Sequence, residues 1–152
     1  SQRSNSFRKK FMIDLVIDTS VIIKWYDEEE NSDTALKIIE LVESKTIKLV
    51  LPQSSPLEVI NSLRLGKKFT LSQTQDSLEA FFDLQPEFVP VDKFFTQKIT
   101  DLAFNQNLTS YDAAFLALAV TRNTLFITAD YKHHQKSISK NIVWLKEWKG
   151  KL

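Results

Sequence analysis

Short apolar runs alternate along the chain with longer amphipathic segments. The runs of strand length are residues 14–17, 47–51, 88–91, 125–128 and 142–145. Between them, apolar side chains recur at helical spacing, which predicts helices over residues 21–26, 31–43, 54–65, 71–84, 94–104 and 110–120. Ser72 is the expected cap of the helix over 71–84. Strands that alternate with helices predict an α/β fold, with a parallel sheet covered by helices on both faces.

The length of 152 residues suits one domain with one hydrophobic core. Residues 1–11 are mostly polar and basic, and we interpret them as an N-terminal extension, either disordered or left from cloning. Residues 12–152 are expected to form the folded domain. They contain no internal repeat and no glycine- or serine-rich linker.

Charge and cysteine content narrow the possible functions. The formal net charge is +1, so any affinity for nucleic acid must come from a local patch. Cysteine is absent, which excludes disulfides, thiol catalysis and cysteine-ligated metals, and fits a reducing cytoplasm. Because no apolar run approaches the roughly 20 residues that cross a bilayer, no contact with a membrane is expected.

Four acidic residues occupy positions that can bring them together. Asp18 and Asp130 follow predicted strands, Glu58 lies in the helix after the second strand, and Asp112 lies in the first turn of the alanine-rich helix. Ligands of parallel sheets collect beyond the carboxyl ends of the strands. Carboxylates that converge there without lysine or arginine partners need a cation, and oxygen ligands select Mg²⁺ or Mn²⁺.

Such a site suits hydrolysis of phosphodiester bonds, because divalent ions activate water and stabilise the leaving oxygen. Thr19 and Ser20 place hydroxyl groups beside Asp18, and Thr128 closes the strand before Asp130. Asn61 follows Glu58 by three residues and is expected on the same side of its helix.

Each acid also has an ordinary structural interpretation. Asp18 can cap the helix that follows it, and Asp112 suits the positive end of a helix dipole. Glu58 can simply face solvent, although its neighbours are apolar. Only the shared placement of the four near strand ends favours the metal site over these interpretations.

The segments VIDTSVIIKW, PLEVINSLR, LTSYDAAFLALA and LFITADYK resemble the four acidic motifs of PIN domains, especially those of VapC-type toxins. The resemblance implies a metal-dependent endoribonuclease with a three-layer α/β/α fold around about five mostly parallel strands. It also implies a homodimer and a cognate antitoxin protein as partner. Asp18, Glu58, Asp112 and Asp130 would then be the catalytic acids and metal ligands, supported by Thr19, Ser20, Asn61 and Thr128.

Basic and aromatic residues supply further candidates. The candidates for contacts with RNA phosphates are Lys24, Arg64, Lys67, Lys68 and Lys132. His133 and His134 are not expected to bind one metal together, because neighbours on a helix point in different directions, and we interpret them as a solvated pair. The aromatic residues Trp25, Tyr26, Phe81, Phe82, Phe94 and Phe95 suit the core, or in part an apolar face for a partner or a dimer.

Two other functions remain open at this point. A PIN-type module that binds RNA or protein without cutting would need no working acid cluster. A receiver-like phosphoryl-transfer domain would need a lysine after a late strand, where this chain has Thr128 and Asp130 instead.

Overall fold

The computed structural model describes residues 12–134 and 139–152. The predicted extension over residues 1–11 lies outside this range. Five strands form one sheet in which every pairing is parallel, in the order β3-β2-β1-β4-β5. The strands are β1 (Ile13–Ile17), β2 (Ile47–Pro52), β3 (Glu87–Val89), β4 (Phe126–Thr128) and β5 (Ile142–Trp144). The predicted α/β fold with about five parallel strands is confirmed.

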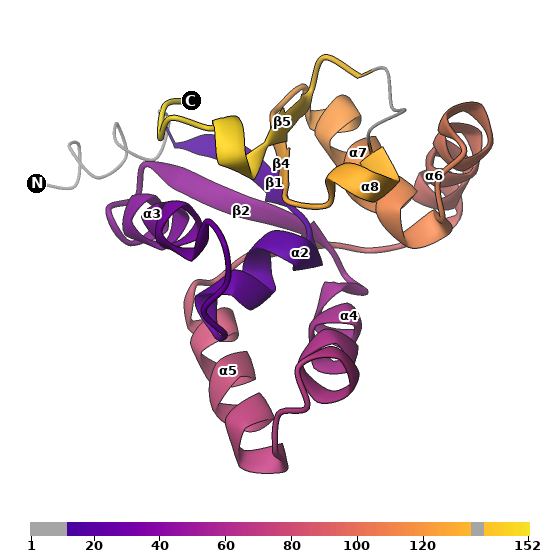
Figure 1. Ribbon diagram of the computed structural model, residues 1–152. Coiled ribbons are helices and arrows are strands. Elements are labelled where there is room, and N and C mark those ends of the chain that lie inside the picture. Colours follow the sequence, from indigo (N-terminus) through magenta and orange to yellow (C-terminus); the bar gives the residue numbers. More distant parts are fainter. Residues whose placement is uncertain (1–11, 135–138) are drawn as a thin grey trace, which may run out of the picture.

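Helices connect the strands and cover the sheet (Figure 1). The α-helices are α2 (Thr19–Ile22), α3 (Ser32–Glu43), α4 (Ser55–Asn61), α5 (Leu71–Asp83), α6 (Lys93–Gln106), α7 (Ser110–Arg122) and α8 (Tyr131–His134). Shorter helical turns are η1 (Ile23–Trp25), η2 (Ser62–Gly66) and η3 (Leu145–Glu147). Helix α5 is capped by Thr70, which forms a reciprocal capping box with Gln73. The prediction of Ser72 as this cap was therefore wrong.

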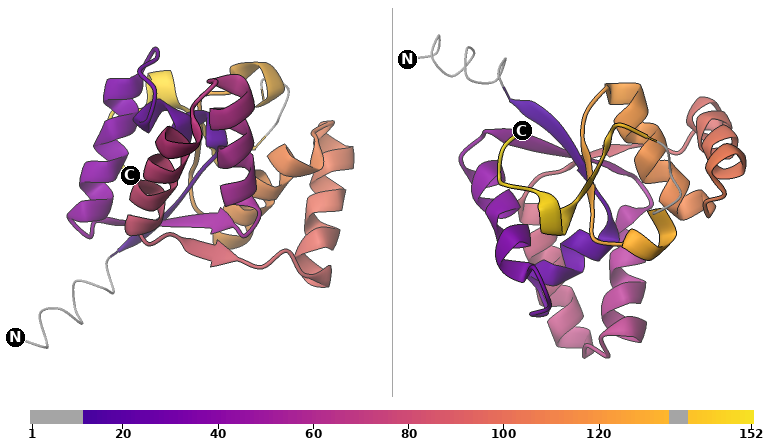
Figure 2. Two further views of the ribbon diagram at one scale, coloured as in Figure 1. Left: turned by 90° about the horizontal axis from the view of Figure 1, so that it is seen from below. Right: turned by 45° about the horizontal axis from the view of Figure 1, so that its top comes forward.

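Helix α7 is the central helix of the fold. Its residues 113–119 are all buried, because the helix lies between the sheet on one side and α6 on the other. The alanines at positions 113, 114, 117 and 119 let the backbone approach β1 and β2 closely. Helix α3 packs against β2, and α4 and α5 form a pair that extends away from the sheet (Figures 1 and 2). For α7, apolar side chains on all sides are expected, because this helix is buried between the sheet and α6.

The two phenylalanine pairs divide between core and surface. Phe81 and Phe95 are buried, whereas their neighbours Phe82 and Phe94 are 49% and 66% exposed. Core packing is therefore confirmed for Phe81 and Phe95, and an apolar face for a partner or a dimer stays a prediction for Phe82 and Phe94. Within the described residues, no helix is both long and apolar enough to cross a membrane.

The strand order defines where a ligand would bind. The chain runs outward from β1 through β2 to β3, then returns to place β4 on the other side of β1. The order therefore reverses between β1 and β4, and in open α/β sheets the binding crevice lies beyond the carboxyl ends of the strands at this switch point. Asp18 follows β1 and Asp130 lies two residues after β4.

Candidate functional site

Asp18 is the most buried of the predicted acids, with 4% of its surface exposed. It occupies the N-cap position of α2, but its side chain makes no capping hydrogen bond. Instead, one carboxylate oxygen accepts a hydrogen bond from Ser20 Oγ and the other accepts one from Thr128 Oγ1 at 2.5 Å. The ordinary interpretation of Asp18 as a helix cap therefore does not describe its side chain.

The hydroxyl groups of Ser20 and Thr128 tie the ends of β1 and β4 together. Ser20 Oγ accepts a hydrogen bond from the backbone N–H of Ala129 at 3.0 Å. Thr128 Oγ1 accepts one from the backbone N–H of Asp130, also at 3.0 Å. The two strand ends and the Asp18 carboxylate thus belong to one network.

Glu58 reaches the same region from α4. Its Oε2 atom is buried and has no hydrogen-bond partner among the described residues. Burial, followed by the charges of Asp18 and Asp112, raises the pKa of Glu58 to about 8. The interpretation that Glu58 simply faces solvent conflicts with the burial of its Oε2 atom.

Asp112 and Asp130 complete the set at two helix starts. Thr109 Oγ1 accepts from the backbone N–H of Asp112 and donates to its carboxylate at 3.1 Å. Asp130 Oδ1 accepts from the backbone N–H of His133, and Asp130 Oδ2 lies 2.6 Å from His133 Nδ1. Both side chains keep partial solvent access, with 22% and 27% exposed.

The electrostatics of the cluster are dominated by burial and mutual repulsion. Burial raises the pKa of Asp18 to about 7 against the hydrogen bonds of Ser20 and Thr128, and the charges of Asp130 and Asp112 act in the same direction as burial. Among residues 12–134 and 139–152, no lysine or arginine forms an ion pair with any of the four acids. In this part of the chain, no three or more acidic or histidine side chains stand, in this conformation, in an arrangement that could hold a metal ion.

His134 joins the cluster, which the sequence analysis did not foresee. It was interpreted as solvated together with His133, but it is fully buried, whereas the side chain of His133 is 55% exposed. Burial lowers the pKa of His134, against the opposing charges of Asp112 and Asp130. The spacing of four between Asp130 and His134 was the available signal, because it places both on one side of a helical turn.

The supporting and basic candidates lie around this centre. Thr19 is buried with its hydroxyl unpartnered among the described residues, and Asn61 is exposed at the end of α4. Lys67 pairs with Asp27 and Glu29, and Lys24 pairs with Glu29, so both neutralise the acidic turn after η1. Arg64, Lys68 and Lys132 are exposed.

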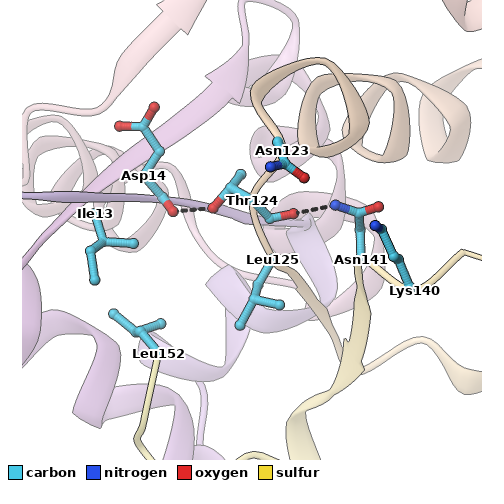
Figure 3. Close-up of a pocket in the computed structure, with 8 residues that line it drawn as sticks. All are labelled: Ile13, Asp14, Asn123, Thr124, Leu125, Lys140, Asn141 and Leu152. Atoms are coloured by element: carbon cyan, nitrogen blue, oxygen red, sulfur yellow. Dashed lines mark hydrogen bonds between the residues drawn. The ribbon is translucent and has the colours of Figure 1, made fainter.

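A pocket at the other end of the sheet has a different character. It lies beside the start of β1, where Thr124 Oγ1 donates to the backbone carbonyl of Asp14 and Asn141 Nδ2 donates to that of Thr124 (Figure 3). Its walls are Ile13, Asp14, Asn123, Thr124, Leu125, Lys140, Asn141 and Leu152. With one carboxylate and a lysine in its lining, this pocket lacks the acidic cluster that the carboxyl end holds.

Three examples illustrate the solved structures with a similar fold. A toxin–antitoxin complex from Klebsiella pneumoniae is 17% identical, covering 85% of this chain and 95% of that one, with a TM-score of 0.61. PAE2754 from Pyrobaculum aerophilum is 15% identical, covering 89% and 92%, with a TM-score of 0.62. VapBC2 from Rickettsia felis, bound to a DNA fragment from its promoter, is 14% identical, covering 87% and 97%, with a TM-score of 0.64. At these identities the likeness shows the fold.

No functionally curated protein matches the sequence. The family model of the PIN domain matches residues 15–138, which include all four acids. The chain therefore belongs to the PIN-domain family.

Proposed function

We propose that this protein is a metal-dependent endoribonuclease that hydrolyses RNA phosphodiester bonds. The observation that carries the proposal is the group of four acids at the switch point, which lack basic partners in the described part of the chain. The raised pKa values of Asp18 and Glu58 indicate that both are destabilised as anions without a cation. Membership of the PIN family points to nuclease chemistry at the same position.

The donor atoms fit a hard divalent cation. Carboxylate oxygens are the ligands that Mg²⁺ and Mn²⁺ prefer, and Glu58 Oε2 is a buried oxygen without a partner among described residues. Asp18 and Asp112 would hold the principal ion, and Glu58 would complete the set. Asp130 would bind a second ion or orient Asp18 through Thr128. Such ions lower the pKa of water and neutralise charge on the phosphate.

The chain's own residues prepare the site for that reaction. Ser20 and Thr128 fix the orientation of the Asp18 carboxylate, and Thr109 fixes that of Asp112. The exposed Arg64 and Lys68 lie just after Glu58 in the sequence, where they would attract the RNA backbone; Lys132 follows Asp130. Lys24 and Lys67 would serve mainly to hold the acidic turn, with RNA contact second.

We further propose that the protein is a toxin of a toxin–antitoxin pair, acts in the cytoplasm and forms a homodimer. Two of the similar structures are a toxin–antitoxin complex and VapBC2. Exposed apolar side chains on two separate parts of the surface support protein partners: Leu57, Leu65 and Leu71 around α4 and α5, and Phe94 and Phe104 on α6. Light scattering of the purified chain would measure its oligomeric state, and a monomer at micromolar concentration would exclude the homodimer.

Digestion of total RNA with Mn²⁺, with sequencing of the new ends, tests the nuclease directly. We expect cleavage that EDTA abolishes and that the Asp18→Asn variant lacks. An RNA-binding module without activity would retard RNA on a gel and leave it uncut, with or without metal. Cleavage that continues in EDTA would contradict the metal-dependent mechanism.

The phosphoryl-transfer alternative gains no support from the site. Among the described residues, no lysine stands beside the four carboxylates in an ion pair, which a receiver-like pocket would need. Incubation with acetyl phosphate should therefore leave the mass of the protein unchanged.

A further inference from the structure

His134 occupies an unusual environment for a histidine. Its side chain is fully buried at the end of α8, and its ring packs edge-on against Phe126 with the ring centroids 5.2 Å apart. Neither ring nitrogen has a hydrogen-bond partner among the described residues. Buried polar groups in folded proteins are normally satisfied, so two unsatisfied nitrogens on one ring require an explanation.

The ring points into the acid cluster. His134 Nε2 lies 3.9 Å from Asp18 Oδ2 and 3.9 Å from Asp112 Oδ1. Both separations are too long for hydrogen bonds. Two ligands at about 2.1 Å from one ion lie at most about 4.2 Å apart, so both separations are within the limit for atoms that share an ion. An ion held by Asp18 and Asp112 would therefore lie within reach of His134 Nε2 and give this nitrogen the partner that it lacks.

We propose that His134 is a nitrogen ligand of the metal that Asp18 and Asp112 hold. This inference rests on the proposed metal-dependent function and extends it to the identity of the ion. Imidazole nitrogen suits first-row transition ions, whereas Mg²⁺ takes oxygen ligands and keeps its water. The site is therefore selective for a transition ion such as Mn²⁺ over Mg²⁺.

Pulsed electron paramagnetic resonance of the Mn²⁺-loaded, full-length protein tests the ligand directly. The chain contains two histidines, so the ¹⁴N coupling typical of a bound imidazole can be assigned with two variants. We expect the coupling in the wild type and in His133→Phe, and its loss in His134→Phe. The phenylalanine ring keeps the packing against Phe126, and circular dichroism would verify that the variant is folded.

Labelling with ¹⁵N-histidine shows, without a substitution, whether either histidine binds the ion. If an imidazole binds the ion, the ¹⁴N pattern of the wild type is replaced by that of ¹⁵N, and this result holds even where His134→Phe fails to fold. Titration calorimetry measures the selectivity for the ion. The His134→Phe substitution should lower the affinity for Mn²⁺ at least 10-fold while changing the affinity for Mg²⁺ less than 3-fold.

The outcomes separate the two proposals. Mn²⁺ that binds and supports RNA cleavage without histidine coupling would overturn the role of His134 and leave the nuclease intact; His134 would then be a core aromatic against Phe126. A wild type that binds neither Mn²⁺ nor Mg²⁺ would overturn both the metal-dependent nuclease and the ligand. Coupling that persists in His134→Phe and disappears in His133→Phe would show that His133 is the ligand and would overturn the role proposed for His134.

Discussion

Strand β1 carries an aspartate near each end, and the two have opposite surroundings. Asp14, near the start of the strand, forms ion pairs with Lys48 at 3.7 Å and Arg122 at 3.2 Å. The same two bases also pair with Glu87, so two acids meet two bases. Asp18, four residues later, has no lysine or arginine ion pair among the described residues; its polar neighbours there are hydroxyl groups, His134 and other carboxylates.

The pKa values show what this difference does. Burial acts to raise the pKa of Glu87, but its hydrogen bonds to Lys48 and Arg122 outweigh burial and hold that pKa below the usual value. At Asp18, burial prevails and the pKa rises to about 7. The paired cluster is neutralised by its own bases, whereas the unpaired one would need a cation, as the proposed function requires. The absence of paired lysine or arginine side chains thus distinguishes the candidate binding carboxylates from the structural ones.

Removing the charge of Asp18 should have the largest effect. Asp18→Asn keeps the shape of the side chain and removes its negative charge, so we expect RNA cleavage to fall by about 10³-fold or more, equivalent to about 4 kcal/mol. The initial rate of Mn²⁺-dependent cleavage measures it. Asp14→Asn, on the same strand, is the matched control and should cleave at the wild-type rate. Equal losses in the two variants would break the contrast between the clusters.

Metal should stabilise only the unpaired cluster. An ion that binds the folded chain at 100 times its dissociation constant raises the free energy of unfolding by about 2.7 kcal/mol. We therefore expect Mn²⁺ to raise the melting temperature of the wild type and of Glu87→Gln by several degrees, reversibly with EDTA. The rise should be much smaller in Asp18→Asn. An undiminished rise in Asp18→Asn would place the ion elsewhere.

The metal-free protein should lose stability as pH rises from 6.5 to 8.5. The folded-state pKa values of Asp18 and Glu58, about 7 and about 8, lie above those of the unfolded chain, so the folded state holds more protons in this window. The stability that comes from the protonated acids is lost as pH passes through these values. We expect a loss of about 2 kcal/mol, at up to about 1.4 kcal/mol per pH unit for each carboxyl.

Urea unfolding at several pH values measures this loss, and Asp18→Asn should show a smaller one. The window begins at 6.5 because the lowered pKa of His134 acts in the opposite sense below that value. A stability that rises with pH between 6.5 and 8.5 would mean that the acids are already compensated without metal.

The smallest effect is expected from the paired cluster. Glu87→Gln removes partly exposed ion pairs, which contribute less than about 1 kcal/mol each and weaken with salt. We expect a slight loss of stability in urea that shrinks at 1 M NaCl, with unchanged cleavage. A salt-independent loss of several kcal/mol would show that this cluster is more than a surface ion network.

The sheet and the four acids could be predicted from sequence because their signals are local. The strands are continuous apolar runs; Asp18 directly follows one, and Asp130 comes two residues after another. Residues that depend on distant contacts could not be predicted in the same way. Lys67 pairs with Glu29 across 38 positions, so nothing near Lys67 indicated that its charge is neutralised.

His134 and Thr70 were missed for different reasons. Helix α8 has four residues, too few for a hydrophobic period to reveal which of its side chains face inward. Thr70 and Ser72 are both suitable caps by residue type, and only the hydrogen bonds with Gln73 distinguish them. Burial and hydrogen-bond geometry, unlike periodicity, are decided by the tertiary structure.

The lone buried oxygen of Glu58 has one more consequence. Asp18, Asp112 and Asp130 are each tethered by hydrogen bonds to neighbouring groups, and Glu58 is the member of the quartet without such a tether in the described chain. In the proposed metal site, an exchange between ions of different radius would therefore be accommodated mainly by movement of Glu58, because the other three carboxylates are held in place. A single glutamate on α4 would give the proposed centre its adaptability.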